Sequence, residues 1–101
     1  MKPKLSNEEL EFIRQKVVRP LNTAGYQVWC FGSRARGEGS RYADVDLLIE
    51  GPGQPRALLS DINEQLIDSN FPYKVDLVLA SDLAKSYWDG VMADRILLNG
   101  Q

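Results

Sequence analysis

Two segments decide the fold of this chain: FGSRARG at residues 31–37 and DVDLLI at residues 44–49. The first starts at the end of a β-branched and aromatic run, Gln27 to Phe31, which predicts a strand. The second alternates acidic and apolar residues, which predicts another strand from Asp44 to Ile49. Gly32 to Tyr42, between them, is rich in Gly, Ser and Arg, so we expect a loop with at most a helical turn after Ser33.

Helices are predicted on both sides of these strands. Ser6 and Glu9 have the spacing of a capping box, so a helix should begin there. Pro20 lacks an amide donor and should kink this helix or split off its last turn, and Gly25 should end it. A second helix is predicted from Pro55 to near Asn70, with an apolar stripe of Leu58, Leu59, Ile62, Leu66 and Ile67.

A third strand is predicted from Lys74 to Leu79, again with alternating acidic and apolar residues. A last helical region should begin near Ser81 and be interrupted or loosened at Gly90, before Ile96 to Leu98. The order helix, strand, loop, strand, helix, strand, helix predicts the α/β (α+β) class. We expect one domain over residues 1–101, with a small mixed, twisted sheet and helices packed on one face.

The composition limits the kinds of partner and of chemistry. Twelve Lys and Arg against fourteen Asp and Glu give a net charge of −2, too balanced for direct nucleic-acid binding by bulk electrostatics. No segment approaches the roughly 20 apolar residues of a membrane span, and we expect no export signal. The single cysteine, Cys30, favours the cytoplasm. Because histidine is absent, acid–base or metal chemistry must use carboxylates.

Three aspartates form the candidate metal site. Asp44 and Asp46 should project from the same face of their strand, roughly 6.5–7 Å apart at the Cα, so their oxygens can converge on a hard cation. Asp76 can join them if the second and third strands are neighbours. We expect no Lys or Arg nearby in sequence to neutralise this cluster. Mg²⁺ fits such a site because it takes oxygen ligands and keeps positions open for water and phosphate oxygens.

The loop after the first strand is the candidate phosphate site. Gly32 allows the backbone to approach a phosphate, and the hydroxyl of Ser33 can donate to its oxygens. The same loop carries Arg34, Arg36 and Arg41, of which at least one could bind the phosphate tail. Arg34 and Arg36 fit a structural or solvated role about equally well.

The combined pattern, Gly-Ser, ten residues and then Asp-x-Asp, resembles the minimal nucleotidyltransferase (MNT) family of the polymerase beta superfamily. Residues 31–37 and 44–49 look like its two signature blocks, and Asp76 looks like its third carboxylate. The resemblance implies that Asp44 and Asp46 hold two Mg²⁺ ions, and that Asp76 completes the metal that activates the acceptor hydroxyl. It implies nucleotide binding by Gly32, Ser33 and Arg36, with ATP as the donor of AMP.

The acceptor is not specified by these residues. MNT proteins of this size look like antitoxin partners of helical HEPN-type ribonucleases, and some place AMP on a tyrosine of the toxin. The leading hypothesis is therefore a protein adenylyltransferase antitoxin that forms a homo- or hetero-oligomer. Two alternatives stay open: a catalytically silent antitoxin that acts by binding, and a transferase for small molecules such as antibiotics. Trp29, Tyr87 and Trp88 are interpreted as core or interface residues.

Overall fold

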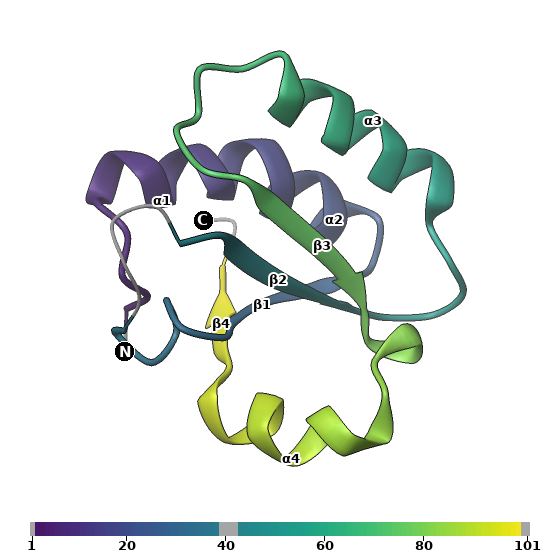
Figure 1. Ribbon diagram of the computed structural model, residues 1–101. Coiled ribbons are helices and arrows are strands. Elements are labelled where there is room, and N and C mark those ends of the chain that lie inside the picture. The colour runs from purple at the N-terminus through teal and green to yellow at the C-terminus, as the bar shows by residue number, and fades with distance from the viewer. Residues whose placement is uncertain (1, 39–42, 100–101) are drawn as a thin grey trace.

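A four-stranded sheet is the centre of the computed structural model, which describes residues 2–38 and 43–99 (Figure 1). Its strands are β1 (Gln27–Phe31), β2 (Val45–Glu50), β3 (Val75–Leu79) and β4 (Ile96–Leu98). They lie in the order β3-β2-β1-β4. β1 is antiparallel to β2 and to β4, whereas β2 and β3 are parallel. The sheet is therefore mixed, as the sequence predicts.

The N-terminal helical segment has three parts: α1 (Asn7–Ile13), a π-helical stretch (Arg14–Val18) and α2 (Arg19–Thr23). The predicted capping box is present, with Ser6 accepting from the Glu9 amide and Glu9 accepting from the Ser6 amide. The π-helical stretch ends two residues before Pro20, whose missing amide removes one regular helical hydrogen bond. Gly25 follows the helix end with a φ of 95°, a conformation that glycine adopts without strain.

The main core lies on one face of the sheet. α1, α2 and α3 (Arg56–Ile67) cover this face in Figure 1. Alternation along the strands directs every second side chain into it, and the helices supply the rest. The predicted fold class is confirmed. The core includes Leu10, Ile13, Val17, Leu21, Val28, Cys30, Val45, Leu47, Ile49 and Ile62.

Three details of the predicted secondary structure and packing are wrong. Ile96 to Leu98 is a strand that pairs with β1, a long-range contact that three residues of sequence do not reveal. α4 (Lys85–Asp94) continues through Gly90 without a break, and it lies on the other side of the sheet from α3 (Figure 1). Ile67 is 80% exposed because the end of α3 extends past the core. No helix in the described residues is long and apolar enough to cross a membrane.

Candidate functional site

The candidate site lies on the sheet face opposite the main core. Asp46 of β2 is the register partner of Asp76 on β3 and of Phe31 on β1, so these three residues form one row across three strands. Neighbouring strands are about 4.8 Å apart, so Asp46 and Asp76 share a small surface. Asp44 is exposed and lies just before β2. Thus the sheet brings Asp46 and Asp76 to one face, and Asp44 lies close enough for its charge to act on Asp46.

The charges of these aspartates act on one another. Burial raises the pKa of Asp46 above its ordinary value, and the neighbouring charges of Asp76 and then Asp44 raise it further. The ammonium of Lys74 acts in the opposite direction. A half-buried carboxylate beside two others carries an electrostatic penalty that a bound cation would relieve. The donor set is therefore of the kind that hard divalent cations prefer.

Gly32 is held against Asp46. Its φ of 76° lies in the left-handed region, and a Cβ at this position would be 2.6 Å from Asp46 Oδ2. No real side chain fits at that distance, so the absence of a side chain at residue 32 allows the carboxylate to stay where it is. The Gly-Ser element and the Asp-x-Asp element, distant in sequence, are thus in direct contact.

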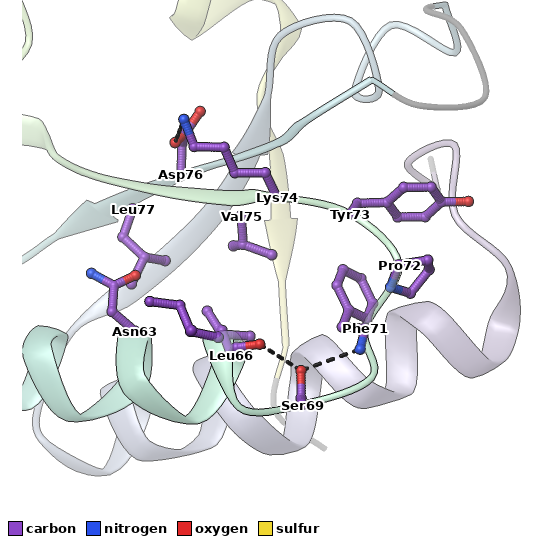
Figure 2. A pocket seen from close by; sticks show the side chains of 11 residues that line it. Asn63, Leu66, Ser69, Phe71, Pro72, Tyr73, Lys74, Val75, Asp76 and Leu77 are labelled. Atoms are coloured by element: carbon purple, nitrogen blue, oxygen red, sulfur yellow. Dashed lines mark hydrogen bonds and ion pairs between the residues drawn. The ribbon is translucent and has the colours of Figure 1, made fainter.

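The position of Lys74 corrects the expectation that no Lys or Arg lies near the aspartates in the sequence. Its Nζ is 3.4 Å from Asp76 Oδ1, so a cation does accompany the acidic cluster. Figure 2 shows Lys74 and Asp76 together on one side of β3, whereas Val75 and Leu77 point toward α3 on the other side. Residues two apart on a strand share a face, so the two-residue spacing of Lys74 and Asp76 could have predicted this ion pair. Within residues 2–38 and 43–99, no three acidic, Cys or His side chains are grouped closely enough, as they stand, to hold a metal ion.

Arg34 has a structural role. It is 4% exposed, and its guanidinium donates to the Ala43 carbonyl from Nε (2.9 Å) and Nη2 (2.7 Å) and to the Lys4 carbonyl from Nη1 (2.7 Å). It also lies over the Tyr73 ring, 4.0 Å from the centroid. Because Ala43 directly precedes Asp44, these bonds fix the chain where it enters the acidic site. The geometry therefore supports a structural role for Arg34 over phosphate binding.

Arg36 lies at the surface and joins the loop to α4. Its Nη1 is 3.2 Å from Asp94 Oδ2, and its Nε is 3.5 Å from Glu38 Oε2. The hydrogen bond to Asp94, together with the charges of Glu38 and Asp94, raises the pKa of Arg36 despite some desolvation. Ser33 is half-buried in the turn that follows β1, where the Arg36 amide donates to the Gly32 carbonyl. The predicted turn after Ser33 is confirmed, and Arg41 lies outside the described residues.

This sheet and this loop are those of a nucleotidyltransferase. The chain belongs to the nucleotidyltransferase domain family, whose model matches residues 10–98. It is also 33% identical over 75 residues to a Haemophilus influenzae protein named probable protein adenylyltransferase MntA. That alignment covers 73% of this chain and 64% of the relative, so the chain spans less than two thirds of the relative's length.

Solved structures show the same fold. A toxin–antitoxin structure with AMP-PNP has a chain with a TM-score of 0.65 and 20% identity, over 87% of this chain and 73% of that one. A mutant MntA–HpeT toxin–antitoxin structure gives 0.64 and 17% identity over the same shares. A Shewanella oneidensis complex of a tri-AMPylated HEPN toxin with an MNT antitoxin gives 0.61 and 17% identity, over 91% of this chain and 73% of that chain.

Proposed function

We propose that this chain transfers AMP from ATP to a hydroxyl group of a partner protein, a tyrosine of a helical HEPN-type toxin, with Mg²⁺. One observation carries the proposal: Asp46 is in contact with Gly32 on one side and is paired in register with Asp76 on the other. A phosphate-binding loop and two carboxylates on a single row are what phosphoryl-group transfer requires. The chain is thus an enzyme of the transferase class, and its donor and acceptor meet at Asp46.

Each site residue has a defined task in this proposal. Asp44, Asp46 and Asp76 would hold two Mg²⁺ ions, which would supply charge stabilisation for the attacking and leaving oxygens. The turn at Gly32 and Ser33 binds the β- and γ-phosphates, with Arg36 at its rim. The acceptor oxygen forms a bond to the α-phosphorus, the bond from that phosphorus to the bridging oxygen breaks, and pyrophosphate leaves. Asp76 accepts the proton of the acceptor hydroxyl.

In the absence of metal, Lys74 is the cation beside Asp76. Its exposed ammonium neutralises part of the charge on Asp76, and a divalent ion at Asp76 would take over that role. The side chain of Lys74 is 71% exposed, so the ion pair is worth little and is easily exchanged. Metal binding would therefore require that this solvated lysine moves and that the carboxylates, which are not grouped closely enough as they stand in the described residues, come together.

The relatives support the choice of acceptor. One is named a probable protein adenylyltransferase, and one solved structure contains an AMPylated HEPN toxin with its MNT antitoxin. AMP-PNP in another of these structures supports an adenine nucleotide as the donor.

A catalytically silent antitoxin is the second candidate, because Lys74 already pairs with Asp76 and, in the part of the chain that the structure describes, no three ligand side chains are grouped for a metal. Expression beside the cognate toxin distinguishes the two. Under the proposed function, Asp46→Asn abolishes the rescue of growth, whereas Asp61→Asn, at an exposed position of α3, keeps it. Rescue by both variants would support the silent antitoxin and overturn the enzymatic proposal.

A further inference from the structure

A groove runs along the free edge of β3. This strand is the outermost on its side of the sheet, and among the residues that the structure describes no other strand pairs with its outer side. Two adjoining hollows, of about 690 and 600 Å³, lie between β3 and α3. Asn63, Ile67 and Leu77 line both of them, so the two hollows form one groove, which follows β3 from Val75 to Leu79. We call it the edge groove.

Apolar side chains at the edge groove are incompletely packed. Ile67 is 80% exposed, although it lies where the two halves of the groove meet. Val75 and Leu77 are half-buried and point toward α3, as does the groove between them (Figure 2). Leu66 of α3 is half-buried on the facing side. The edge groove can therefore bury apolar side chains of another chain.

The backbone of β3 can also pair with another strand. The Val45 amide donates to the Lys74 carbonyl at 2.9 Å, which starts the parallel pairing of β2 with β3. Successive residues of a strand direct their amide and carbonyl groups to opposite sides. Lys74 and Asp76 thus direct theirs to β2, whereas Val75 and Leu77 direct theirs to the free edge. An exposed edge of this kind is where extended peptides add to a sheet.

Asp76 connects this edge to the acidic site. It lies in the middle of β3, with its side chain on the acidic face, whereas Val75 and Leu77 lie on the groove face (Figure 2). In an added strand, the residue opposite Asp76 has its side chain on the acidic face, and its two neighbours have theirs on the groove face. One extended segment can therefore contact the acidic site and the edge groove at the same time.

The width of the sheet favours a long side chain opposite Asp76. An added strand lies roughly 4.8 Å from β3 and about twice that from β2, which carries Asp46. A serine hydroxyl stays beside its own strand at this spacing. The side chain of a tyrosine can lie across the face of the sheet, so its hydroxyl passes Asp76 and approaches Asp46.

We propose that the edge groove binds the acceptor: an extended segment of the partner protein adds to β3 as a further strand, with its tyrosine opposite Asp76 and an apolar residue on each side of that tyrosine in the groove. This rests on the proposed function and specifies the sequence that its acceptor site recognises. The segment lies outside the helices of the partner, because only an extended backbone alternates with a period of two. The phenolic oxygen forms the bond to the α-phosphorus, pyrophosphate leaves, and the phenolic proton passes to Asp76.

The first test measures AMP transfer from Mg²⁺-ATP to short synthetic peptides, catalysed by the whole chain. The reference peptide has a central tyrosine, valine at the two neighbouring positions and serine elsewhere. Glutamine in place of both valines should lower kcat/KM at least about tenfold, because two apolar side chains are lost from the groove. Glutamine two positions away from the tyrosine should change kcat/KM less than about threefold, because those side chains do not enter the groove. Serine in place of the tyrosine should take no AMP.

The second test changes the groove and leaves the acidic site intact. Ile67→Lys should raise KM for the reference peptide at least about tenfold and keep kcat and ATP affinity within about twofold, because it removes binding that is made before the chemical step. Gln65→Lys is the matched control. It adds the same side chain at an exposed position of α3 outside the groove lining and should leave all three quantities unchanged.

The outcomes separate this inference from the proposed function. If the toxin takes AMP but Ile67→Lys acts as Gln65→Lys does, the acceptor does not bind in the edge groove and the inference is wrong. It is also wrong if the toxin takes AMP and no peptide does, or if glutamine lowers transfer only three or four positions away from the tyrosine, as for a docked helix. If neither the toxin nor any peptide takes AMP, the proposed function fails and this inference fails with it.

Discussion

Substitution of Gly32 by alanine tests the contact between the loop and the acidic site. Gly37 provides a matched control, because it lies in the same loop with a φ of 74° against 76° for Gly32, and a Cβ there meets nothing within 4 Å. A non-glycine residue in this backbone conformation costs roughly 1–2 kcal/mol. Both variants should therefore lose about that much stability.

Only the Gly32 variant also disturbs Asp46. The new Cβ would lie 2.6 Å from Oδ2 but 3.5 Å from Cγ and 3.6 Å from Cβ of Asp46, so only the carboxylate oxygens have to move. Rotation off the preferred side-chain angle adds about 0.5–1.5 kcal/mol. The extra loss of stability is small, whereas displacement of a metal-binding oxygen by about 1 Å can cost on the order of 100-fold in activity.

The assay combines urea denaturation with calorimetric titration of ATP in the presence of Mg²⁺. Gly37→Ala should lose stability and keep ATP affinity within about twofold, whereas Gly32→Ala should lose similar stability and bind ATP at least about tenfold more weakly. Equal ATP affinities in the two variants would refute the reasoning, because the contact with Asp46 would then have no functional consequence.

Three further predictions concern the same site and its supports. Without metal, ionised Asp46 destabilises the fold, because its folded pKa is raised; this penalty is absent at low pH and grows as pH rises from the ordinary aspartate range through the folded pKa. Asp46→Asn should thus become more stable than the original chain as pH rises. Melting temperatures of both chains are compared from about pH 3, below the ordinary aspartate pKa of about 3.9, to about pH 8. A difference in melting temperature that stays constant over this range would contradict the prediction. Arg34→Met should cost about 3 kcal/mol in urea denaturation, because it leaves two carbonyls without their donors; a cost below about 0.5 kcal/mol would show that those bonds are not needed. Ile67→Lys should change the free energy of unfolding by less than about 0.5 kcal/mol, because Ile67 is exposed. Ile62→Ala, at a position 2% exposed, should lower the free energy of unfolding by about 2–5 kcal/mol. Similar losses in the two variants would mean that the end of α3 is packed.

The features that could be predicted from the sequence are local in origin. The boundaries of β1 follow from a short β-branched and aromatic run that ends at Gly32. The first helix start follows from the reciprocal Ser6 and Glu9 bonds. Alternation on β2 and β3 predicted that Asp46 and Asp76 share a face, because the period of a strand is two residues. These signals involve neighbours along the chain and therefore survive without knowledge of the fold.

The features that were missed depend on contacts between distant segments. β4 has only three residues, and its pairing with β1 is what makes it a strand. Arg34 could be assigned a structural role only once the carbonyls of Lys4 and Ala43 were seen beside it. The break expected at Gly90 did not occur, because the cost of one glycine is too small to end a helix held by the rest of its turns. Lys74 was different, since its spacing from Asp76 was available in the sequence.

The most direct measurement of the central claim is the intact mass of the cognate HEPN-type toxin after incubation with this chain, ATP and Mg²⁺. Transfer predicts a toxin heavier by one or more AMP groups, with the added mass on tyrosine, absent when Mg²⁺ is chelated or Asp46 is replaced by Asn, and retained with Asp61→Asn. A toxin that is neutralised by the chain at unchanged mass would contradict the account.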